Sequence, residues 1–183
     1  MKKFIVWFAA LCIVFFLPML PIHAQDSEET SVASPSPAIE YKLPYPGMLP
    51  DNPLYKIKVL RDKIMLILIN DPNKKAAYHL LLANKQLLMS KMLVDKGNIP
   101  LARETALKGE NQITLMTFAF KKAGLKPQEN FLNEVKMATL KHQELLKEII
   151  AKVPADDAGT FSTVLEFSQR NVDELQNLTI EAK

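Results

Sequence analysis

The chain has 183 residues, a length typical of one domain with short appendages. Apolar residues make up 48% and charged residues 23%, which is ordinary for a chain that buries a core, and only five glycines argue against a barrel or sandwich of many tight turns. Removing Lys2 and Lys3 at the N-terminus from the 23 basic residues leaves 21 against 20 acidic ones. This balance predicts no nucleic-acid binding.

Residues 1–24 have the pattern of a secretory signal peptide. Lys2 and Lys3 precede an apolar run from Phe4 to Ile22, which ends at the small residue Ala24. We therefore expect an exported, extracytoplasmic protein that is periplasmic, displayed on the cell surface or secreted. The apolar run is also long enough to cross a bilayer, so an uncleaved anchor that tethers the chain to the membrane is the alternative. The single cysteine, Cys12, lies inside this run.

Residues 25–40 are polar and rich in serine and proline towards their end, which predicts a flexible linker. The predicted helical domain follows at 41–179. It begins with a proline-rich segment, residues 41–52, that we call the strap. Pro46 and Pro50 favour an extended path and Gly47 supplies a turn, while Tyr45 is one of its apolar side chains and Asp51 lies at its end as a candidate helix cap. Its interleaved apolar side chains favour packing in a groove between helices. The alternative is an exposed proline-rich ligand for a partner.

The first predicted helix starts at Pro53, after a cap at Asp51 or Asn52, and runs to Ile69. Residues 64–69 are apolar on every side of the helix. A helix of this kind is either buried at the centre of a domain or membrane-seeking. Six residues are too few to span a bilayer, so we expect this helix to be central.

Four longer helices follow, with a proline near each start. The first runs from Pro72 to Gly97 and the second from Pro100 to Gly124, and the third begins at Pro127 and is separated from the fourth by a turn at Val153-Pro154. Their apolar residues recur at alternating spacings of three and four. The fold class is therefore all-α, an up-and-down bundle of four to five helices with an N-terminal strap. Two helical hairpins in series, a short solenoid, are the alternative. Gly109 lies in a stripe of small residues and predicts a close approach by a large neighbour or by the strap.

His142 is the one residue on an apolar stripe that titrates near neutrality. Folding the last two helices about Pro154 brings it towards Ser168, which predicts a core histidine that is hydrogen-bonded to this hydroxyl or to water. The alternative is a metal ligand or a pH-sensitive switch. No carboxylate lies three or four residues from His142 in the chain, so a metal site has little support.

Motifs of catalysis and cofactor binding are missing from the sequence. It contains no glycine-rich dinucleotide or phosphate loop and no Gly-x-Ser-x-Gly. We therefore expect no catalytic residues, no cofactor and no resident metal.

The chain resembles an uncharacterised family of exported or membrane-tethered bacterial helical domains, a domain of unknown function. The resemblance covers roughly residues 41–178. It is carried by Tyr45-Pro-Gly-x-Leu-Pro-Asp51-x-Pro-Leu-Tyr55, Asp71-Pro-x-Lys-Lys75, Lys96-Gly-Asn98, Lys141-His142 and Val153-Pro154. It implies an extracytoplasmic helical domain and supplies no activity. Some members of the family carry a second histidine late in the last helix, where this chain has Arg170-Asn171, and this weakens a two-histidine metal site.

These observations favour a non-catalytic binding or scaffolding module of the cell envelope. Its partner would be an envelope protein, a polymer or a second copy of the chain. One alternative is an extracytoplasmic sensor of metal or pH that uses His142. The other is a peripheral membrane-associated protein that contacts the membrane surface through the first helix and its lysines.

Overall fold

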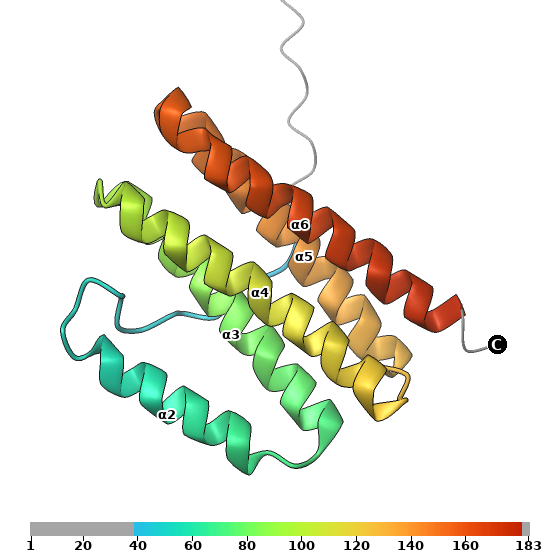
Figure 1. The fold of residues 1–183 in the computed structure, drawn as a ribbon. Coiled ribbons are helices and arrows are strands. Elements are labelled where there is room, and N and C mark those ends of the chain that lie inside the picture. The colour runs from blue at the N-terminus through green and yellow to red at the C-terminus, as the bar shows by residue number, and fades with distance from the viewer. Residues whose placement is uncertain (1–38, 181–183) are drawn as a thin grey trace, which may run out of the picture. The chain divides into compact units, whose positions relative to one another are not determined.

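The structure, a computed structural model, describes residues 39–180, which form five α-helices and no strand (Figure 1). The helices are α2 (Tyr55–Leu68), α3 (Pro72–Asp95), α4 (Ile99–Ala123), α5 (Glu129–Lys152) and α6 (Ala155–Ile180). The predicted all-α class is therefore confirmed. The predicted signal peptide lies outside the described residues, as does nearly all of the predicted linker. Within the described range, every helix is too short or too polar to cross a membrane.

The four long helices close into an antiparallel bundle (Figure 1). Three residues join α3 to α4, and Val153 and Pro154 join α5 to α6. The two hairpins pack together along two seams, α3 against α5 and α4 against α6. Each helix therefore has two neighbours in the bundle, as predicted for an up-and-down arrangement.

Capping residues begin and end the long helices. The side chain of Asp71 accepts a hydrogen bond of 2.8 Å from the backbone N–H of Lys74, which caps α3. Asn98 caps α4 in the same way, accepting from the backbone N–H of Leu101. Gly124 ends α4 in the left-handed region, with φ of 62°, where a side chain would be strained.

The bundle core consists of two apolar clusters, one near each end. The first is centred on Leu87, Leu146 and Phe161, and the second on Ile113, Met116 and Phe120. Tyr41 of the strap packs against the second cluster and Leu43 against the first. The segment at the start of the domain therefore contacts both halves of the core.

The strap lies against the bundle with alternating buried and exposed residues. Pro46 and Leu49 are buried, whereas Tyr45 is 77% exposed. Gly47 has a φ of 73° and marks a turn. Pro50 is half-buried, and the Asp51 carboxylate pairs with Lys96 at 2.8 Å, which joins the end of the strap to the end of α3.

Helix α2 is not central, so that prediction was wrong. None of its residues is buried, and it lies on the outside of the bundle (Figure 1). Four long helices already bury their apolar stripes against one another and leave no interior position for a fifth. The apolar run of residues 64–69 therefore has one side towards the bundle and one side towards solvent.

Gly109 lies where α3 and α4 approach closely. A Cβ at this position would overlap the Cδ2 atom of Leu87 and lie 3.3 Å from the Leu87 backbone nitrogen. The close neighbour is thus a large side chain of α3, not the strap. Leu87 is itself fully buried, so it has no free space into which it could move.

Candidate functional site

Five polar side chains separate the two apolar clusters in the middle of the bundle. We call this set the polar layer: Asn84 of α3, Glu110 of α4, His142 of α5, and Ser168 and Asn171 of α6. Each of the four bundle helices contributes at least one member. All five side chains are buried, His142 with 0% and Glu110 with 1% of its surface exposed.

Hydrogen bonds connect the polar layer to the strap on one side. The His142 Nε2 atom lies 2.8 Å from Asn84 Oδ1, and Asn84 Nδ2 donates to the Tyr41 hydroxyl at 2.8 Å. Because Asn84 presents its oxygen to the ring, Nε2 carries the hydrogen and donates it. The lone pair of neutral His142 is then on Nδ1, which faces Glu110.

A second set of hydrogen bonds holds Glu110 from α6. Asn171 Nδ2 donates to Glu110 Oε1 at 2.8 Å, and the Thr114 hydroxyl donates to Asn171 Oδ1 at 3.2 Å. The other carboxyl oxygen, Oε2, lies 4.0 Å from His142 Nδ1. This separation is too long for a hydrogen bond, and among the described residues neither Oε2 nor Nδ1 has a hydrogen-bond partner of good geometry. The two unpartnered atoms therefore face each other inside the core.

Burial determines the protonation of this pair. Desolvation raises the pKa of Glu110 to about 7, against the smaller lowering effects of Asn171 and Ser168. Desolvation also lowers the pKa of His142 to about 3. At mildly acidic pH the pair thus holds one proton, on the carboxyl group, and carries no net charge. This arrangement avoids leaving an isolated charge in the core.

The predicted partnership between His142 and Ser168 is not found in the structure. Ser168 is buried in the same layer, but its hydroxyl makes no hydrogen bond of good geometry. It lies close enough to Glu110 to lower the pKa of that carboxyl group, while the hydrogen bond of His142 goes to Asn84. The group that titrates near neutrality is Glu110, not His142.

The polar layer has few of the features of a metal or catalytic site. Nowhere in residues 39–180 do three His, Cys, Asp or Glu side chains gather closely enough to hold a metal ion. His142 and Glu110 supply two ligand atoms, whereas zinc sites use at least three from the protein. His142 is also fully enclosed, so its ring is out of reach of a substrate.

The sequence did not point to Glu110, because helical spacing relates His142 only to residues of its own helix. Glu110 approaches His142 from α4, across the bundle. A signal was available, since Glu110 falls between Ala106 and Ile113 at core spacing, and Asn84 falls between Leu80 and Leu87 in the same way. A polar residue at a core position in several helices predicts a buried polar layer.

A groove of about 420 Å³ between α4 and α6 lies beside Glu110. Glu110 and Asn171 contribute to its lining, together with Leu107, Phe167 and Arg170. The Arg170 guanidinium stacks on the Phe167 ring, 4.4 Å from its centroid. Glu110 thus borders this groove although only 1% of its surface is exposed.

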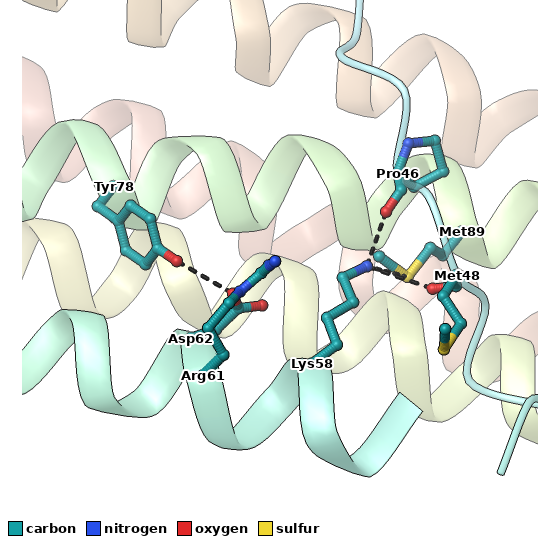
Figure 2. A network of polar contacts seen from close by, with 7 residues as sticks. All are labelled: Pro46, Met48, Lys58, Arg61, Asp62, Tyr78 and Met89. Atoms are coloured by element: carbon teal, nitrogen blue, oxygen red, sulfur yellow. Dashed lines mark hydrogen bonds and ion pairs between the residues drawn. The ribbon is translucent and has the colours of Figure 1, made fainter. Parts of the chain in front are cut away.

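Helix α2 is held to the bundle by polar contacts of its inner face (Figure 2). The Lys58 ammonium donates to the backbone oxygens of Pro46 at 2.7 Å and Met48 at 3.2 Å, and Met89 Sδ lies 4.0 Å away. The Tyr78 hydroxyl donates to Asp62 at 3.0 Å. Partial burial lowers the pKa of Lys58. These contacts fix which side of α2 faces the bundle.

The opposite side of α2 exposes a continuous apolar surface. We call it the outer face of α2: Ile57, Leu60, Ile64, Ile67 and Leu68. Ile57 is 65% and Ile67 is 75% exposed. At 3.6 residues per turn these five side chains fall within about 100° of the helix circumference. Contiguous exposed apolar surface is uncommon on folded domains, so this face is the candidate binding surface among the described residues.

Comparison with known proteins identifies one family. A family model described as "Domain of unknown function (DUF5667)" matches residues 47–156, more than half of the chain. No curated protein and no solved structure matches. The matched range covers the end of the strap, α2 to α5 and the loop before α6. The chain therefore belongs to the DUF5667 family.

Proposed function

We propose that this protein is a non-catalytic binding module of the bacterial cell envelope and that its binding element is the outer face of α2. The observation that carries the proposal is the concentration of exposed apolar surface on this helix. Of the fifteen exposed large apolar side chains among the described residues, seven lie between Leu54 and Leu68. The signal-like N-terminus supports an extracytoplasmic location, and an uncleaved N-terminus would tether the module to the membrane.

The polar contacts of α2 support the same role. Lys58 bonds to the strap and Asp62 to Tyr78 of α3, so the inner side of the helix is turned towards the bundle and the outer face is left to a partner. The buried polar layer has no comparable access to a partner.

Photo-crosslinking in cells tests this proposal. A photoreactive phenylalanine analogue at position 60 of the full chain is expected to crosslink to an envelope component, because Leu60 lies in the middle of the outer face. The matched control places the analogue at position 118, since Phe118 is 61% exposed on α4. Equal crosslinking from the two positions, or none from position 60, would rule the proposal out. Fractionation of the same cells tests the envelope location.

A second candidate function is a response to pH through Glu110, favoured by its position beside the α4–α6 groove with a pKa of about 7. Three titratable groups lie in or against the polar layer: Tyr41 of the strap, Glu110 of α4 and His142 of α5. The members from α3 and α6 are amides and a hydroxyl. Carbon-13 NMR of labelled glutamate is expected to show the Glu110 carboxyl titrating near pH 7. Titration at an ordinary value of about 4 would remove this candidate.

A further inference from the structure

We infer that the outer face of α2 docks on an anionic lipid surface, with the helix lying in the plane of the membrane interface. This inference rests on the proposed function and names its partner. Helices that bind in this way have an apolar face that enters the boundary between headgroups and acyl chains, and basic residues beside it. Both features occur on α2.

Basic side chains border the apolar stripe of α2 on both sides. At 100° per residue, Lys56 and Lys63 lie at one edge of the outer face, and Arg61 lies at the other. All three are exposed. The helix contains four basic residues, including the inward-facing Lys58, and one acidic residue. Its charge is therefore complementary to a negative lipid surface, which attracts basic residues next to an apolar face.

The one acidic residue of α2 faces the bundle. Asp62 accepts a hydrogen bond from Tyr78 at 3.0 Å and pairs with Arg61 at 2.7 Å (Figure 2). It lies on the side of the helix opposite the outer face. Anionic headgroups would therefore meet the ammonium groups of Lys56 and Lys63 beside the apolar side chains, whereas the charge of Arg61 is offset by Asp62.

The same charge pattern disfavours a second copy of the chain as the occupant. Pairing two α2 outer faces would bring Lys56 and Lys63 of both copies to one edge of the interface. The only carboxylate of α2 is turned away from that interface. Like charges without counterparts destabilise such a pair, whereas they strengthen contact with an anionic membrane.

The arrangement of α2 suits a flat surface. The helix lies on the outside of the bundle (Figure 1), and Lys58 bonds it to the strap on its inner side. Its inner residues Tyr55, Val59 and Leu66 line a groove of about 430 Å³ towards α3 and α4. The outer face is thus held away from the core, and its apolar side chains can enter a lipid interface without unfolding the bundle.

Depth-dependent fluorescence quenching tests the inference on the full chain. A Cys12→Ser, Leu60→Cys variant carries an environment-sensitive fluorophore at position 60 and is mixed with vesicles of equal parts phosphatidylglycerol and phosphatidylcholine. Brominated lipids are expected to quench this fluorophore, and added salt should weaken the effect. Vesicles of phosphatidylcholine alone should give little quenching. The same fluorophore at Phe118→Cys should not be quenched, even where the N-terminus itself enters the bilayer.

Charge reversal provides the matched pair of variants. The double variant Lys56→Glu, Lys63→Glu is expected to need at least about tenfold more lipid for half-maximal quenching at position 60. Lys136→Glu with Lys147→Glu makes the same change of net charge on α5 and should leave it unchanged. Equal melting temperatures show that both pairs fold, since all four side chains are exposed.

The outcomes separate the lipid surface from the proposed function. Absence of quenching at position 60, or equal quenching in neutral vesicles, would overturn the inference. If position 60 then still crosslinks to a protein in cells, the proposed binding function is retained and the partner is a protein. Crosslinks between two copies of the chain would show that the partner is a second copy. Absence of both quenching and crosslinks would contradict the lipid inference and the proposed function.

Discussion

Replacing Glu110 with glutamine is expected to make the free energy of unfolding rise with pH between about 4.5 and 6.5, where that of the wild type stays nearly constant. In the wild type, the unfolded pair holds one proton in this range, on His142, and the folded pair also holds one, on Glu110. Equal proton counts give no slope. The Gln variant keeps a buried His142 that is neutral when folded and protonated when unfolded, so its stability increases by roughly 1 kcal/mol per pH unit.

The opposite slope is expected for His142→Gln. Glu110 alone has a folded pKa of about 7 and an unfolded value of 4.5, so the folded state binds the extra proton. Its contribution to stability is complete below pH 4.5 and is lost as the pH rises to about 7. The double variant should again be nearly flat. Urea unfolding at a series of pH values measures all four proteins. Parallel curves would contradict a proton held within the pair.

Gly109→Ala is expected to destabilise the protein by about 1–2 kcal/mol, although alanine is the better helix former. The new Cβ overlaps Leu87, which is fully buried, and the resulting overpacking costs about 1–3 kcal/mol. The gain in helix propensity offsets at most about 1 kcal/mol of this cost. Chemical denaturation of the variant measures the difference.

Gly159→Ala is the matched control for this substitution. Gly159 lies in α6, is exposed, and has nothing within 4 Å of an added Cβ. The same change should therefore stabilise the protein by up to about 1 kcal/mol. The two substitutions are thus expected to change the free energy of unfolding in opposite directions. A stabilised Gly109→Ala variant would show that α3 and α4 can separate at little cost.

Local signals in the sequence were enough to predict the four long helices. Asp71 and Gly124 act through atoms within a few residues of themselves, as a side-chain cap and as a left-handed terminus. Such effects do not depend on the rest of the fold, so they can be predicted from the sequence. The spacing of apolar residues then predicted a bundle because each stripe needs a partner.

The position of α2 was not predictable in the same way. Residues 64–69 are apolar on all sides, a composition that fits a central helix and a helix on a membrane-facing surface equally well. Burial depends on the space left by the other four helices, which no local pattern records. The inward turn of Asp62 towards Tyr78, sixteen residues away, likewise depends on tertiary packing.

The partner of His142 could not be predicted from the sequence for a related reason. Helical spacing relates residues of one helix, whereas Glu110 meets His142 from a different hairpin. The pairing of α3 with α5 and of α4 with α6 had to be known before Asn84, Glu110 and His142 could be placed in one layer.

The polar layer also fixes the axial register of the four bundle helices. Apolar stripes of leucine and alanine pack almost equally well after one helix slides by a turn, about 5.4 Å along its axis. Such a slip would move Asn84 or Glu110 from hydrogen-bonding partners to the apolar side chains of a neighbouring cluster and leave buried polar groups unpaired. The layer therefore gives up some apolar burial in exchange for a single alignment. We expect substitution of all five members by apolar residues to give a bundle with several alignments of its helices.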